Sequence, residues 1–182
     1  MRRFAPLCLL LLVGPVVRAG SVEIDVNDDT ARAVVAWEVR FERLGVDTGW
    51  LHHQDNGDVG HFGLHVAGNV GSGAHPVRAG VGARAFYVDA ASQDGVALGI
   101  GGFVRYPLSA SRVELGAELY LAPGSLASGD LDRYIEAAAL VGFRILDRAE
   151  IHVGFRLAEV DLAGGSEVTI EEGAYVGIRL EF

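Results

Sequence analysis

The chain has no lysine, a single cysteine, and no apolar run after residue 19 that is long enough for a membrane helix. A spanning helix needs about 20 mostly apolar residues, so helical membrane proteins are excluded. Because Cys8 lies in the N-terminal apolar stretch, disulfides, thiolate metal sites and a cysteine nucleophile are excluded for the rest of the chain. After residue 19, twelve arginines face 24 acidic residues, a net charge of −12, which argues against a nucleic-acid partner.

The first 19 residues have the pattern of a secretory signal peptide. Arg2 and Arg3 precede the apolar stretch Leu7–Val17, and Val17 and Ala19 are acceptable at the two positions that a signal peptidase reads. We therefore expect cleavage before Gly20, which leaves residues 20–182 as one domain. A retained N-terminal anchor is the alternative, but the stretch is short for a spanning helix.

Apolar and polar residues alternate along the remaining chain, as is typical of β-strands with one apolar face. Its many glycines, 25 in all, favour sharp turns between such strands. We predict an all-β fold, a single antiparallel transmembrane β-barrel of about ten strands, with eight as the alternative if the short first run is only a lead-in. The runs are 21–27, 32–42, 46–53, 61–70, 77–88, 96–106, 112–122, 134–145, 150–160 and 174–182.

The last run, 174–182, has one apolar face and ends on an aromatic residue, as the closing strand of an outer-membrane barrel does. We expect it to pair with the run 21–27 and to close the barrel. The residues that carry this closing signal are Tyr175, Val176, Ile178, Leu180 and Phe182. A soluble β-sandwich or barrel is the alternative, because it also has one apolar face per strand.

Outward-facing aromatic residues favour the membrane barrel, since a sandwich has no reason to sort them to strand ends. Aromatic side chains gather at the two membrane interfaces in such barrels. One predicted group is Trp50, Phe62 and Tyr87, and the other is Phe41, Tyr106, Phe143 and Phe182. Trp37 and Phe155 fall nearer the middle of their strands and belong to neither group.

The connections alternate in predicted length: 43–45, 107–111 and 146–149 are short and 71–76 is modest, whereas 54–60, 89–95, 123–133 and 161–173 are longer and acidic. Outer-membrane barrels have short periplasmic turns and longer extracellular loops. The pattern predicts a bacterial outer-membrane protein with periplasmic termini and extracellular long loops. The expected partners are outer-membrane lipid, lipopolysaccharide and the barrel-assembly machinery, and the protein is expected to be a monomer.

The alternate face of the strands is rich in charge, and we predict an interior ion-pair network. A barrel of this size encloses about enough space for its own side chains, and unpaired charges there are costly. The predicted members are Arg32, Glu38, Arg40, Arg78, Arg84, Arg105, Arg112, Glu114, Glu118, Glu136, Arg144, Arg156 and Arg179. A structural plug is one interpretation; a narrow, porin-like pore, with inward glycines leaving a thin water path, is the other.

Histidines and aspartates near residues 52–65 are weak candidates for a metal site, namely His52, His53, Asp55 and Asp58. His61 and His65 share the inward face, but a spacing of roughly 13 Å along a strand is too long for one ion. Acidic loops that capture divalent cations, or that serve as an interaction surface, are a second functional alternative. No cofactor is expected.

An enzyme is the third alternative. Outer-membrane hydrolases and acyltransferases place a histidine beside an acid or a serine at the rim, and His53 has Asp55, Asp89, Ser92 and Ser125 as candidate partners. No nucleophile elbow, zinc-protease motif or phosphate loop occurs in the sequence. We therefore expect no catalytic activity.

Four segments of the chain resemble the YfaZ-type family of Gram-negative outer-membrane proteins. They are AGSVEIDVN at 19–27, GWLHHQDNGD at 49–58, GDLDRY at 129–134 and EGAYVGIRLEF at 172–182. The resemblance extends over the mature chain and implies a small β-barrel. None of these segments is a catalytic motif, so the resemblance implies no enzymatic chemistry.

Overall fold

A computed structural model describes residues 17–39, 43–71, 76–109 and 111–182. Most of the expected signal peptide, residues 1–16, therefore lies outside the described residues, as do Arg40 and Phe41. The first described strand already begins at Val17, three residues before the expected cleavage point.

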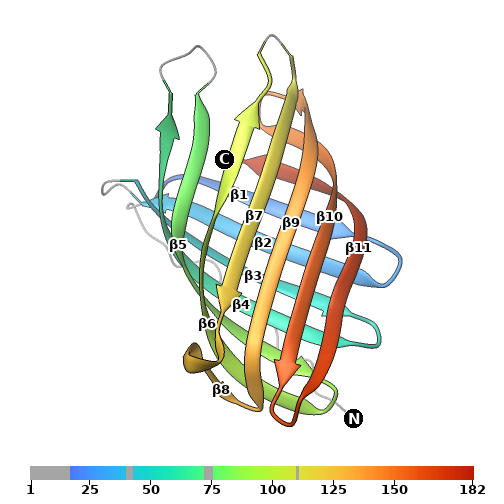
Figure 1. The fold of residues 1–182 in the computed structure, drawn as a ribbon. Coiled ribbons are helices and arrows are strands. Elements are labelled where there is room, and N and C mark those ends of the chain that lie inside the picture. Colours follow the sequence, from blue (N-terminus) through green and yellow to red (C-terminus); the bar gives the residue numbers. More distant parts are fainter. Residues whose placement is uncertain (1–16, 40–42, 72–75, 110) are drawn as a thin grey trace.

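Ten long strands form one closed antiparallel barrel. Each pairs with the next along the chain, and the first pairs with the last. They are β1 (Val17–Val26), β2 (Thr30–Val39), β3 (Leu44–His53), β4 (Gly57–Val70), β5 (Val77–Ala90), β6 (Gln93–Pro107), β7 (Val113–Ala122), β9 (Leu131–Leu146), β10 (Ala149–Leu162) and β11 (Ser166–Glu181). The wall made by β7, β9, β10 and β11 crosses the wall made by β1 to β4 (Figure 1). The ten-stranded prediction is confirmed, and the eight-stranded alternative is wrong.

The connection between β7 and β9 holds the two remaining elements, the one-turn 3-10 helix η1 (Gly124–Leu126) and the short strand β8 (Ala127–Gly129). β8 pairs with the start of β6, where Gly129 lies opposite Gly95. No helix in the described part of the chain has the length and apolar character needed to cross a membrane.

The closing strand pairs as the sequence predicts. β1 and β11 run antiparallel from the pair Ser21 and Glu181 to the pair Val26 and Val176. At the end of the chain, Gly20 and Phe182 exchange two backbone hydrogen bonds of 2.9 Å each. The Phe182 ring also lies over Gly20, where a side chain would have no room. A glycine there lets the terminal aromatic ring pack directly on the first strand.

The predicted loop lengths are wrong for three of the four loops expected to be long. At the end of the barrel that we call the hairpin end, the connections are 27–29, 54–56, 91–92, 123–130 and 163–165. At the opposite, terminal end, which holds Gly20 and Phe182, they run from two residues at 147–148 to six at 71–76. The acidic segments continue the strand ladder, as Asp161 opposite Glu167 and Asp89 opposite Asp94 show. Acidic composition alone did not indicate a loop, because charged side chains can alternate outward on a strand.

The outer wall is an apolar band with aromatic residues toward both ends. Exposed outward aromatics near the hairpin end are Trp50, Phe62 and Tyr87, and those near the terminal end are Tyr106, Phe143 and Phe182. Between them the exposed side chains are mainly valine, leucine and isoleucine, such as Val81, Ile100 and Val153. A surface of this kind suits lipid rather than water.

Candidate functional site

The interior of the barrel has three zones, and the first is an apolar seal at the hairpin end. It comprises Leu51, Val59, Phe86, Val88, Ala90, Ala97, Tyr120, Ala122, Leu131, Tyr134, Ala158, Val160, Leu162 and Ile170. The rings of Phe86 and Tyr134 pack at 4.5 Å between centroids, and both side chains are fully buried. Because water does not reach these residues, the seal closes the hairpin end.

The second zone is an ionic layer below the seal. It comprises Glu23, Asp25, Arg32, Asp47, Arg84, Glu118, Glu136, Arg156, Glu171 and Arg179. Arg32 is its centre, with carboxylate oxygens of Glu23 and Asp25 at 3.1 Å, Glu118 at 3.3 Å and Glu136 at 3.7 Å. These residues come from β1, β2, β7 and β9, so the layer ties opposite walls together.

Two other arginines of the ionic layer, Arg84 and Arg156, each contact both carboxylates and an aromatic ring. Arg84 donates to Asp47 at 2.8 Å, and its guanidinium lies 4.1 Å from the centre of the Tyr120 ring. Arg156 donates to Asp25 and Glu171 and lies 4.2 Å from the centre of the Tyr175 ring. Arginine suits this role because its planar guanidinium forms several directed hydrogen bonds and stacks on aromatic faces.

The third zone is a vestibule, a cavity of about 370 Å³ that opens at the terminal end. It extends from Asp47 and Arg84 of the ionic layer to Pro76, Pro107 and other residues at the strand ends. None of the seal residues lines it. The vestibule is therefore open at the terminal end, and the apolar seal lies beyond the ionic layer toward the hairpin end.

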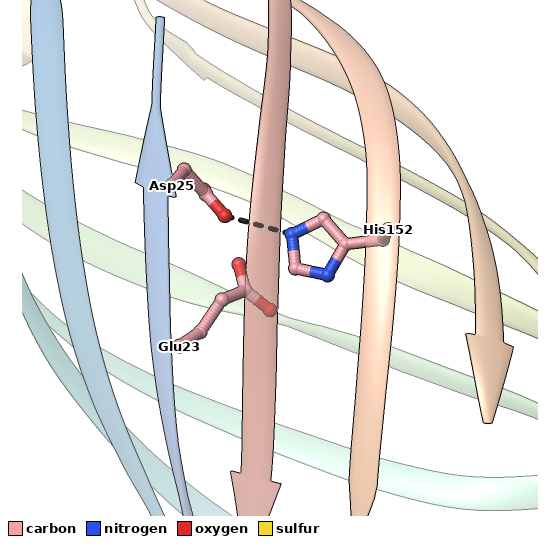
Figure 2. A group of neighbouring side chains, drawn as sticks. All are labelled: Glu23, Asp25 and His152. Carbon is pink, nitrogen blue, oxygen red and sulfur yellow. Dashed lines mark hydrogen bonds and ion pairs between the residues drawn. The ribbon is translucent and has the colours of Figure 1, made fainter. Parts of the chain in front are cut away.

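Glu23, Asp25 and His152 form a cluster that could offer three ligand atoms to a metal ion (Figure 2). Their carboxylate oxygens already have donors. Both oxygens of Glu23 pair with arginines, Arg32 and Arg179. In Asp25, Oδ1 is 2.7 Å from His152 Nε2, and Oδ2 pairs with two arginines. A divalent ion would have to displace guanidinium groups, so the cluster is better described as a junction of the ion-pair network.

The predicted network members occupy several different places. Arg32, Arg84, Arg156, Arg179, Glu114, Glu118 and Glu136 lie in or beside the ionic layer. Arg78 and Glu38 pair with each other at the exposed terminal end. Arg105 and Arg144 line the vestibule, and no described carboxylate lies within 4.0 Å of either. Arg112 precedes β7 and is exposed, and it is not among the residues that line the vestibule; Arg40 lies outside the described residues.

The predicted network lacked several interior residues, among them Glu23, Asp25, Asp47, Glu150, His152 and Glu171. Asp47 has three side-chain partners, since its two oxygens lie 3.2 Å from His61 and from His65 and it also accepts from Arg84. The two histidines, which share the inward face of β4, both contact this one carboxylate. Strict alternation along β3, where Val46 and Thr48 flank Asp47, carries the signal that would have found it.

The weak metal candidates make two separate contacts, His52 with Asp58 and His53 with Asp55, and do not form one cluster. His52 faces outward, where its Nδ1 lies 2.7 Å from Asp58. His53 Nδ1 instead accepts the backbone N–H groups of Asp55 and Asn56 and so stabilises the β3–β4 turn. These contacts also occupy the ring nitrogen that a catalytic arrangement with Asp55 would need.

Inward glycines provide the space for large side chains of neighbouring strands rather than a thin water path. A side chain at Gly99 would meet Phe86, one at Gly154 would meet Tyr175, and one at Gly142 would meet Glu150. Of these four glycines, only Gly116 gives room to an arginine, which is Arg105. Aromatic and acidic side chains therefore fill the space beside Gly99, Gly142 and Gly154.

A closed antiparallel barrel with an apolar outer band, aromatic residues toward both ends and an ion-paired interior defines an outer-membrane β-barrel protein. The family described as YfaZ precursor matches residues 1–182, so the chain belongs to the YfaZ family. This confirms the family resemblance found in the sequence. Over 180 residues the chain is 29% identical to outer membrane protein YfaZ of Escherichia coli (strain K12), covering 98% of this chain and 97% of that protein.

Three solved structures have limited similarity to this chain. The channel DcaP of Acinetobacter baumannii has a TM-score of 0.42 and 13% identity over 93% of this chain, which spans 60% of the DcaP chain. The KdgM porin, solved in complex with disordered oligogalacturonate, has a TM-score of 0.44 and 12% identity, covering 91% of this chain and 99% of KdgM. Neisserial surface protein A has a TM-score of 0.37 and 13% identity, covering 90% of this chain and 94% of that one.

Proposed function

We propose that this protein is a non-conducting structural barrel of the outer membrane rather than a narrow pore. The apolar seal supports the proposal, since side chains at its centre such as Phe86, Val88 and Ile170 are fully buried. Water leaves narrow apolar constrictions, and ions then face a high barrier. We further propose that it acts as a monomer in contact with lipid and lipopolysaccharide, is inserted by the barrel-assembly machinery, and has no enzymatic activity.

Single-channel recording on the refolded protein in planar bilayers tests the proposal. We expect no discrete conductance steps, because the seal separates the vestibule from the hairpin end. A porin of known conductance, refolded in the same detergent, is the positive control. Regular steps from the folded protein would overturn the closed-barrel proposal in favour of the narrow pore.

We propose that the termini face the periplasm and the hairpin end faces outward. Near the hairpin end the outward residues become acidic, as at Asp89, Asp94 and Asp161, which suits an end that extends beyond the bilayer into water. An epitope tag inserted after the exposed Ser125 is expected to bind antibody on intact cells. Binding only after permeabilisation of the outer membrane would reverse the orientation.

A further inference from the structure

We propose that the vestibule binds a small organic anion, held by the guanidinium group of Arg105. This inference goes beyond the structural role and does not depend on whether the barrel conducts, because the vestibule is open at the terminal end in either case. The ligand group would be an oxyanion, either a carboxylate or a phosphate.

Arg105 differs from the arginines of the ionic layer in forming no ion pair with a described carboxylate. It projects inward from β6 and is half-buried, yet no carboxylate of the described residues lies within 4.0 Å of it. Its side chain makes no hydrogen bond to another described residue. A guanidinium has five N–H donors, and at a half-buried position that lines the open vestibule water can reach them. An oxyanion in the vestibule would replace that water as the acceptor.

The position of Arg105 is determined by a glycine on the neighbouring strand. Its Nη1 lies against Gly116, and a Cβ atom built there would overlap with Nη1. The guanidinium therefore rests on the wall of β7. Planar guanidinium groups placed in this way bind carboxylate and phosphate oxygens through two parallel hydrogen bonds.

The other charges of the vestibule favour one small anion rather than a long acidic chain. Of the carboxylates that line the same cavity, all but one pair with described arginines; these paired ones are Glu23, Glu38, Asp47, Glu114 and Glu118. The exception is the exposed Glu181 at the end of β11, which has no described arginine within 4.0 Å. Arg144 is a second cation toward the mouth, also without a described carboxylate within 4.0 Å. The cavity ends at the ionic layer, and this limits the length of any ligand.

Calorimetric titration of the full chain, refolded in detergent micelles, tests this assignment. The probes are glucuronate, which has a carboxylate, glucose 6-phosphate, which has a phosphate, and uncharged glucose. We expect at least one of the anions to bind and glucose not to bind. Binding of only one anion would identify the preferred oxyanion. Absence of binding by both anions at millimolar concentration would overturn the proposal.

Three variants separate the role of Arg105 from that of general charge. Arg105→Gln is expected to weaken binding by about tenfold to a hundredfold, since hydrogen bonds to a charged group are lost. Arg112→Gln removes an exposed arginine outside the vestibule and is expected to leave the affinity unchanged. Gly116→Ala keeps every charge but displaces the Arg105 side chain, so it should also weaken binding. Heat-modifiable gel migration confirms that each variant is folded; an unchanged affinity in folded Arg105→Gln would overturn the proposal.

Discussion

Replacing Phe86 and Tyr134 together by alanine is expected to convert the closed barrel into an ion-conducting one. Their rings pack at 4.5 Å and fill the middle of the seal. Without them the constriction becomes wide enough and polar enough for water, because the buried Glu136 lies directly beside Tyr134. Single-channel recording is expected to show discrete steps in the double variant and none in the unmodified protein.

Each of these substitutions can cost about 3–5 kcal/mol of stability, so folding must be checked by heat-modifiable migration. Phe62→Ala is the matched control, since it removes an exposed ring from the outer face of β4 and should not produce steps. A milder pair, Val88→Ser with Val160→Ser, makes the seal polar while keeping both rings. If both seal variants fold and neither conducts, the seal is not what closes the barrel.

Arg156→Ala is expected to lower the free energy of unfolding by about 3–5 kcal/mol, the typical cost of removing one partner of a buried ion pair. The Arg156 side chain is 1% exposed and donates to Asp25 and Glu171 from opposite sides. Its loss leaves two buried carboxylates without their shared cation, and it also removes the contact with the Tyr175 ring. Urea unfolding of the refolded protein in lipid vesicles provides the measurement.

Arg133→Ala is the control for that experiment. Arg133 also pairs with an acid, Asp161 at 2.7 Å, but its side chain is 54% exposed, so its loss should cost about 0–1 kcal/mol. Equal destabilisation by the two variants would contradict the view that the ionic layer, rather than surface pairing, stabilises the barrel.

The fold was predictable because one regular signal repeats through the whole chain. Alternation with period two gave the strands and their faces, and the apolar Val176, Ile178 and Leu180 gave the closing strand. Strand ends were less predictable, because the acidic residues at 161 and 167 continue the ladder instead of forming a loop. The hydrogen-bond register between neighbouring strands decides where each strand ends, and that register is not visible in the composition of one strand.

The seal was not predicted, although one residue signalled it. Glu159 points outward, while Ala158 and Val160 point inward. In the middle of β10 the polar residues, such as His152 and Arg156, point inward and the apolar ones point outward. Glu159 therefore marks the level at which the interior becomes apolar. The shared contacts of Asp47 were equally hidden, because they need the pairing of β3 with β4.

The seal also has a consequence for the order of folding. Its residues come from β3, near position 51, through β11, at position 170, so it joins parts of the chain more than a hundred residues apart. The β1–β11 pairing that completes the wall joins still more distant residues, such as Val22 and Leu180. Contacts between residues so far apart form slowly, since a large loop must close first. An incomplete chain lacking β11 can therefore form neither the wall nor the full seal, and both are completed in the same late step.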